Sequence, residues 1–214
     1  MSDDVKRPYR SRRRAESAEQ TRDLIRAAAA RLFVTQGVSA TTMRQVAAEA
    51  GVAERTVYTA FPTKAVLFNE VVNIATAGDD LPIAVANRPG FADCLAATDP
   101  RRAAELAVDF GTAVLERAGD LIMAAIESSG ADADMREFCD RGAANHQANM
   151  LALAQAWERN GLLRDHLDAT AAGALLHTLG SPHVHHLLRR QQDWPAERYR
   201  DWFIDTLLAT VLKG

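Results

Sequence analysis

The side chains best suited to recognition chemistry lie in one short stretch, TTMRQVAAEAGVAERTVYTAFPTK, from Thr41 to Lys64. It holds two arginines, a tyrosine, a lysine and several threonines. Arginine, hydroxyl and amine groups hydrogen-bond to phosphate oxygens, and several of them also bond to base edges. This set of side chains therefore indicates contact with a nucleic acid, provided that the fold presents them on one surface.

Two short helices would position these side chains. Thr42 is placed to cap the first helix and Gly51 to end it in a left-handed conformation. The apolar stripe of this first helix consists of Met43, Val46, Ala47 and Ala50, which are at helical spacing. In the second helix, which Pro62 ends, Val57 and Phe61 would face a core. The pattern predicts a helix-turn-helix, whose second helix enters the major groove of DNA; the alternative is an ordinary helical hairpin with a solvated polar face.

Charge is distributed unevenly along the chain. The formal net charge is −3, yet residues 1–64 contain 12 Lys and Arg against 7 Asp and Glu, whereas residues 65–214 contain 13 against 21. Much of the basic excess lies in KRPYRSRRR, from Lys6 to Arg14, which has no apolar periodicity and is expected to be a disordered arm. Such an arm suits phosphate contact or a narrow minor groove; the alternative is a solubilising tail.

Residues from about Glu19 to Phe68 resemble the DNA-binding domain of the TetR family of bacterial transcriptional regulators. The resemblance is carried by AEQTRDLIRAAAARLFVTQGVSATT, MRQVAAEAGV, ERTVYTAF and PTKAVLF, in this order and spacing. It implies contacts with double-stranded DNA from Thr42, Arg44, Arg55, Thr56, Tyr58, Thr59 and Lys64. Two departures concern operator recognition. Ala53 stands where relatives often have a hydroxyl cap, and Ala60 where they frequently have a histidine.

The rest of the chain shows helical periodicity and no extended alternation of the β type. Its composition, 48% hydrophobic but only 6% aromatic, suits an all-α bundle. We expect a loop or broken helix at 79–100, and helices at about 101–118, 120–129, 133–160, 168–190 and 195–212. The expected architecture is all-α: a basic disordered arm at 1–18, a three-helix DNA-binding domain at 19–66, and a helical effector-binding and dimerisation domain at 67–214.

The last helix carries more apolar surface than a monomer needs. One apolar stripe is enough for a helix on a monomer's surface, but here Ile204 and Leu208 add a second side. We therefore expect a homodimer in which the last two helices of each chain pair, as the resemblance also implies. The alternative is a helix in the centre of a monomeric bundle. The expected interface consists of Leu187, Tyr199, Trp202, Phe203, Thr206 and Leu207.

The resemblance also implies a small-molecule effector that enters a cavity in the helical domain and moves the recognition helices. His146 lies on an otherwise apolar helical stripe, and a buried imidazole needs a partner. That partner is either a hydrogen bond within the core or an effector, whose identity the residues leave open. The candidate effector residues are Phe110, Met123, His146, Met150, Trp157 and His177.

Other chemistries lack their motifs. His183, His185 and His186 do not place three imidazoles on one helical face, and neither a metal nor another cofactor is expected. The absence of a glycine-rich phosphate loop or nucleophile elbow argues against an enzyme. Cys94 and Cys139 suit reduced thiols, and no signal peptide or membrane-spanning run is seen, so we expect a bacterial cytoplasmic protein with no membrane partner.

Together these patterns predict a DNA-binding transcriptional regulator, a repressor that binds a palindromic operator as a homodimer and is released by a small molecule. One alternative is a DNA-binding protein without an effector. The other is a helical ligand- or metal-binding protein or enzyme whose helix-turn-helix is incidental.

Overall fold

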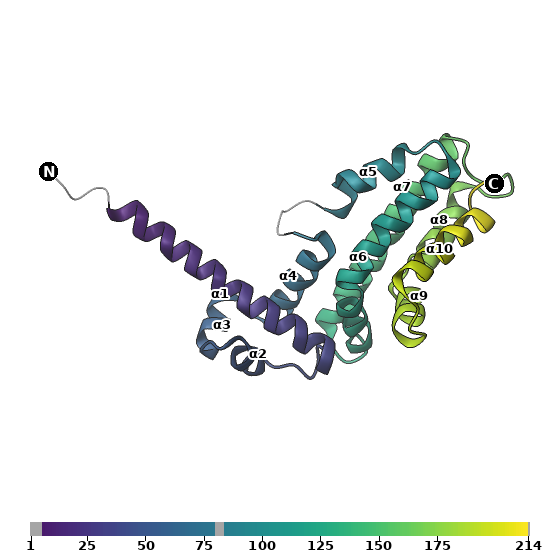
Figure 1. Ribbon diagram of the computed structural model, residues 1–214. Helices are drawn as coiled ribbons and strands as arrows, with labels where there is room; N and C mark the ends of the chain where they lie inside the picture. The colour runs from purple at the N-terminus through teal and green to yellow at the C-terminus, as the bar shows by residue number, and fades with distance from the viewer. Residues whose placement is uncertain (1–5, 80–83, 214) are drawn as a thin grey trace. The chain divides into compact units, whose positions relative to one another are not determined.

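The computed structural model describes residues 6–79 and 84–213, with the side chains of 16–79 and 84–213 (Figure 1). Every regular element in these residues is a helix, and an isolated bridge joins Leu163 to Leu212. The chain divides into two compact units, Met1–Val71 and Val72–Gly214. None of the described helices is both long and apolar enough to cross a membrane. The prediction of an all-α fold is confirmed.

Four helices build the first unit: α1 (Lys6–Gln36), α2 (Met43–Ala50), α3 (Glu54–Ala60) and the start of α4 (Lys64–Ala77). Their apolar stripes meet in one core, where Phe33 packs edge-on against Phe68 with ring centroids 5.4 Å apart. The buried apolar side chains are Ile25, Ala28, Ala29, Phe33, Val38, Met43, Val46, Ala47, Val57, Phe61, Leu67, Phe68 and Val71. Met43, Val46 and Ala47 of the predicted α2 stripe thus lie in the core of this unit, while Ala50 is half-buried.

The start of the chain differs from the expected disordered arm at 1–18. Residues 6–18 form the first turns of α1, a helix of 31 residues, while residues 1–5 lie outside the described part of the chain. Five of the thirteen residues in this segment are Arg and two are Ala, and both are strong helix formers. Since the segment continues directly into the packed part of α1, it extends an existing helix and needs no nucleus of its own.

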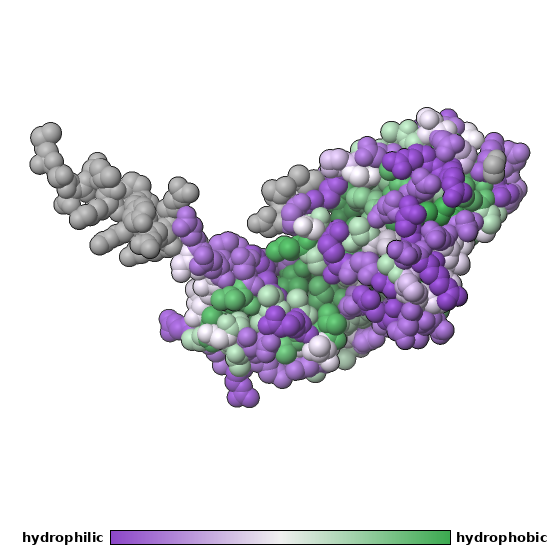
Figure 2. All heavy atoms as spheres, viewed as in Figure 1, coloured by the Kyte–Doolittle hydropathy of each residue, from purple (hydrophilic) through white to green (hydrophobic). Residues whose placement is uncertain are grey.

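The second unit is a bundle in which α6 and α7 lie side by side, α8 packs on α7, and α9 and α10 pack on α6 (Figure 1). Its helices are α5 (Pro89–Ala96), α6 (Pro100–Ser128), α7 (Ala133–Arg159), α8 (Ala169–Leu179), α9 (Pro182–His186) and α10 (Ala196–Thr210), with a 3-10 turn η1 (Val85–Asn87) and a π-helical turn η2 (Leu187–Gln191). The surface of this unit in view is mostly hydrophilic (Figure 2).

Two helix boundaries in the second unit correct the prediction. The expected helices 101–118 and 120–129 are one continuous helix, α6, which runs through Gly119. A Cβ at Gly119 would lie 3.4 Å from Nδ1 of His185, so this glycine permits close packing. The expected helix 168–190 is divided after Leu179, because the Ser181 side chain caps a new helix that begins at Pro182.

The segment expected as a loop or broken helix at 79–100 contains η1 and α5. Pro89 occupies the first turn of α5, where its missing N–H and fixed φ suit a helix start. Residues 80–83 lie outside the described part of the chain.

Candidate nucleic-acid interface

Thr42 and Gln45 form a complete capping box at the start of α2. The Thr42 hydroxyl accepts a hydrogen bond from the backbone N–H of Gln45 at 3.2 Å, and the Thr42 backbone N–H donates to Gln45 Oε1 at 2.8 Å. The predicted cap is confirmed. The Thr42 side chain is exposed, and its contact with a phosphate stays a prediction.

A Schellman turn connects α2 to α3. Gly51 has a φ of 68°, and its N–H donates to Ala48 O at 3.2 Å, while the N–H of Val52 donates to Ala47 O at 3.0 Å. This left-handed conformation is the one predicted for Gly51. At the next residue but one, Ala53 provides no side-chain cap for α3, also as predicted.

Helix α3 separates its apolar and polar residues onto two faces. Val57 and Phe61 are fully buried, whereas Arg55, Tyr58 and Thr59 are exposed. The Tyr58 side chain, 48% exposed, is one of the few large apolar surfaces that the chain leaves in solvent. Helix α3 therefore presents an arginine, a phenol and a hydroxyl together on a surface that the unit does not cover.

The other predicted DNA contacts have different surroundings. Arg44 is exposed and, like Arg55, forms no ion pair with any residue that the structure describes. Thr56 is half-buried. The half-buried ammonium of Lys64 donates to Val38 O at 2.7 Å and to Ser39 O at 3.4 Å, so it ties the start of α4 to the loop between α1 and α2.

Sequence reasoning missed a group of charges that joins α1, α3 and α4. Arg22 donates through Nη1 to Ala60 O at 2.8 Å and through Nη2 to Glu70 Oε2 at 2.5 Å. Glu70 Oε1 accepts from Arg26 Nη1 at 2.7 Å. The repeat of two arginines four residues apart on α1 is visible in the sequence, but their shared carboxylate on α4 is not.

The charge of Arg26 is firmly held in this group. Burial lowers the pKa of the Arg26 guanidinium, but hydrogen bonds to Glu70, Asp23 and Glu19 outweigh burial and raise it above its usual value. The guanidinium of Arg26 therefore stays charged at any physiological pH.

In the second unit, the structure brings two of the predicted effector residues together. The rings of His146 on α7 and His177 on α8 have centroids 4.7 Å apart, and both side chains are half-buried. Burial, reinforced by the neighbouring His177, lowers the pKa of His146 from 6.5 to about 4. Nδ1 of His177 is buried and has no hydrogen-bond partner among the described residues.

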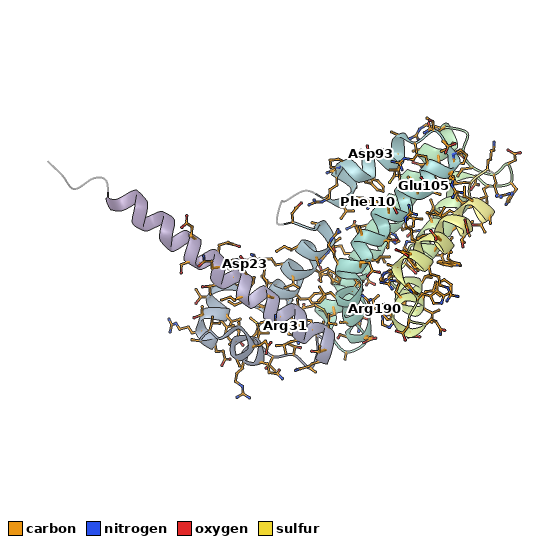
Figure 3. All side chains as sticks on the ribbon, in the orientation of Figure 1. Asp23, Arg31, Asp93, Glu105, Phe110 and Arg190 are labelled. Atoms are coloured by element: carbon orange, nitrogen blue, oxygen red, sulfur yellow. The ribbon has the colours of Figure 1, made fainter. Side chains whose placement is uncertain are left out.

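The remaining effector candidates lie in other surroundings. Trp157 is fully buried, and its Nε1 donates to Cys94 O at 3.0 Å, which gives it a structural role in the core. Phe110 on α6 packs against Phe91 of α5, with ring centroids 5.9 Å apart (Figure 3). Met150 packs against the core one turn from His146, and Met123 is half-buried.

A shallow surface pocket of about 360 Å³ lies at the corner between α5 and α6. None of the six predicted effector residues lines it; the lining residues are Asp93, Ala96, Ala97, Thr98, Asp99, Arg102 and Leu106.

The predicted dimer residues fall into two groups. Tyr199, Phe203 and Leu207 are buried in the core of their own chain, because α10 turns this stripe towards α6, and they are not available to a partner. Leu187 is 48% exposed, and Trp202 and Thr206 are half-buried. The two apolar sides expected on α10 are thus largely one broad buried face.

Of the three histidines of α9, His185 is buried. Its side chain is 1% exposed, and its Nε2 lies 3.0 Å from Glu116 Oε1, which also accepts from Arg189 Nε at 2.6 Å. Burial lowers the pKa of His185, and the bond to Glu116 opposes this only in part. Within residues 6–79 and 84–213, no group of three or more His, Cys, Asp or Glu side chains is arranged to hold a metal ion.

Comparison with known proteins adds two findings. Residues 25–71 match the family described as bacterial regulatory proteins, tetR family. No curated protein matches the chain.

Solved structures share the fold over almost the whole chain. NalD, the secondary repressor of the MexAB-OprM multidrug efflux pump in Pseudomonas aeruginosa, is 24% identical with a TM-score of 0.71, over 93% of this chain and 99% of that chain. A complex of SmeT with triclosan is 18% identical with a TM-score of 0.69, over 91% and 93%. A transcriptional regulator from Saccharomonospora viridis, described as putative and bound to choline, is 17% identical with a TM-score of 0.66, over 92% and 100%.

The matched segment covers the capping box, the Schellman turn and all of α3, the elements that present Arg55 and Tyr58. The structural similarity extends the same architecture, an N-terminal helix-turn-helix unit followed by a helical unit, through the rest of the chain. Residues 25–71 thus match the TetR family of bacterial regulatory proteins, and the chain as a whole shares the fold of these solved structures.

Proposed function

We propose that this protein is a transcriptional repressor that binds an inverted-repeat operator as a homodimer and is released by a small molecule. The proposal assigns DNA binding to residues 19–66, and effector binding and dimerisation to residues 67–214. One observation carries it: α3 buries Val57 and Phe61 while Arg55 and Tyr58 face solvent. A short solvent-facing helix after a tight turn is the element that enters the major groove in helix-turn-helix proteins.

The proposed DNA contacts divide by chemistry into base readers and phosphate contacts. Arg55 is the proposed base reader, because an unpaired guanidinium can bond to both acceptors of a guanine. Thr56, Tyr58 and Thr59 add hydrogen bonds from the same helix. Thr42, Arg44 and Lys64 are the proposed phosphate contacts; the ammonium of Lys64 has three donors and the loop carbonyls do not require all of them.

The proposed dimer face is the part of α10 and η2 that the core leaves accessible. It contains Leu187, Trp202 and Thr206, and the ring of Trp194 packs edge-on against Trp202 with centroids 6.0 Å apart. Tryptophan is enriched in the centres of protein interfaces. A dimer also serves the DNA side, since two recognition helices must reach successive major grooves about 34–36 Å apart.

The proposed effector region surrounds His146 and His177. A buried imidazole nitrogen without a partner, such as Nδ1 of His177, is a group that a ligand would satisfy. Structures of this fold have been solved with triclosan and with choline, so small organic molecules are the class to screen. With a compound that releases DNA from the unaltered protein, His146→Ala is expected to keep operator affinity and lose the response; an unchanged response would remove His146 from the effector region.

Selection from random duplex DNA tests the proposal directly. The purified protein is expected to enrich sequences with inverted-repeat symmetry, and their affinity is expected to fall about 10³–10⁵-fold between 50 and 200 mM salt if 6–10 phosphates are contacted. Enrichment of no sequence, a strictly monomeric protein, or a flat salt response would contradict the proposal.

Two substitutions test the division of roles. Arg55→Ala is expected to relax the preference at particular base pairs by about 1–3 kcal/mol, whereas Lys64→Ala weakens binding to all sequences and makes the salt slope shallower by about one. Because Lys64 also holds the α1–α2 loop, the thermal stability of Lys64→Ala is measured alongside. If both variants behave alike on all sequences, the assignment of Arg55 as a base reader is wrong.

A further inference from the structure

The two ends of α3 are held in different ways. The helix has only 7 residues, and Ala53 at its start makes no side-chain capping bond. At its other end, Ala60 O accepts a hydrogen bond from Arg22 Nη1 at 2.8 Å. A cation bonded to the last carbonyls of a helix also interacts favourably with the helix dipole. Arg22 on α1 therefore supplies at the end of α3 the side-chain support that its start lacks.

The guanidinium of Arg22 is itself held on two further sides. Its Cζ lies 4.3 Å from the centroid of the Phe61 ring, which is fully buried. Its Nη2 donates to Glu70 Oε2 on α4 at 2.5 Å, and the side chains of Arg22 and Glu70 are only 31% and 28% exposed. The second oxygen of Glu70 accepts from Arg26, so the carboxylate is fixed as well. One planar group thus bonds to α3 and α4 at once.

From this geometry we infer that Arg22 and Glu70 are positioning residues, which fix the C-terminal end of recognition helix α3 to α1 and α4 and so set the specificity of DNA binding. The inference rests on the proposed function.

The positioning role requires a side chain with several hydrogen-bond donors in a fixed arrangement. Arginine presents several N–H groups in a plane and can bond to Ala60 O and Glu70 together, whereas lysine offers a single charged point. If Arg22 instead contacted a phosphate as a simple positive charge, lysine would replace it. Arg22→Lys therefore separates a positioning role from a phosphate contact, because the substitution keeps the charge and removes the fork.

The experiment uses the full-length protein and two duplexes of equal length: the inverted repeat that the unaltered protein enriches, and a random sequence. Fluorescence anisotropy measures both affinities over a range of KCl concentrations, at a temperature where circular dichroism shows each variant to be fully folded. Arg22→Lys and Glu70→Gln are expected to lose about tenfold in affinity for the repeat, the size expected for a lost charge-assisted hydrogen bond. Their affinity for the random duplex and the salt slope of Arg22→Lys are expected to stay unchanged.

Arg31→Lys is the matched control, because Arg31 also lies on α1 and pairs with Glu49, but this pair is exposed (Figure 3). It is expected to bind both duplexes like the unaltered protein. Folded Arg22→Lys that binds the repeat as tightly as the unaltered protein overturns the inference, as does an equal loss on both duplexes. If Arg22→Lys does not fold, the near-isosteric Glu70→Gln decides by the same criteria. If the unaltered protein itself selects no DNA, the proposed function fails and the inference with it.

Discussion

His146 is expected to make the stability of the second unit depend on pH. In the unfolded chain its imidazole takes up a proton near pH 6.5, whereas in the folded protein burial and His177 lower its pKa to about 4. Between these values the unfolded state binds more protons than the folded state, so stability falls as the pH falls. The stability contributed by the neutral, buried ring is complete above about pH 6.5 and lost progressively towards pH 4.

The size of the effect follows from the two pKa values. For a pKa of 6.5 in the unfolded chain and about 4 in the fold, the loss is about 2 kcal/mol at pH 5 and about 3 kcal/mol at pH 4, relative to pH 7.5 or above. Carboxylates titrate in the same range, so the quantity of interest is the difference between the unaltered protein and His146→Gln, which has no imidazole at this position.

Urea unfolding followed by circular dichroism at pH 7.5, 6, 5 and 4.5 provides the measurement. The unaltered protein is expected to lose about 2 kcal/mol more than His146→Gln between pH 7.5 and pH 5. His183→Gln, at an exposed histidine of α9, is the control and should follow the unaltered protein. Parallel curves for the unaltered protein and His146→Gln would refute the argument that burial beside His177 keeps this imidazole neutral.

Three further predictions concern packing and capping. Gly173→Ala places a Cβ 3.1 Å from Cα of Leu151 on the facing helix, and should lower the free energy of unfolding by about 1–3 kcal/mol. The control is Gly142→Ala, which has open space around it on α7 and should raise the free energy of unfolding by up to about 1 kcal/mol. A similar change in urea midpoint for both variants would contradict the close α7–α8 contact. Thr42→Ala should remove the capping box and about 1 kcal/mol of stability from the first unit, whereas Ala53→Ser should add a similar amount, both read from thermal melting. The hydroxyl of Tyr199 is buried without a hydrogen-bond partner among the described residues, so Tyr199→Phe should leave the melting temperature unchanged or raise it, and a clear drop would reveal a hidden partner.

The helix-turn-helix was predictable because its signals are local. The cap at Thr42, the left-handed Gly51, and the buried pair Val57 and Phe61 all depend on residues within one or two helical turns, where spacing and backbone preferences decide the conformation. Family resemblance added the expected DNA contacts, which remain predictions, and the exposure of Arg55 and Tyr58 is compatible with them.

Local signals failed where packing between distant residues decides. The expected break between 118 and 120 is absent, and Gly119 lies inside α6, where the missing Cβ leaves room for His185 from a distant part of the chain. The apolar residues of α10 predicted a second face for a partner, yet Tyr199, Phe203 and Leu207 are all buried in the core of their own chain.

From sequence alone come the helical class, the order of the elements and the composition of the recognition helix, since periodicity and capping chemistry act over a few residues. Tertiary structure decided which polar groups meet: Arg22 with Ala60 O and Glu70, Lys64 with Val38 O, and His146 with His177. These partners are roughly 26 to 48 residues apart in the sequence. Contacts between residues so far apart depend on how the helices pack, and local sequence patterns do not predict them.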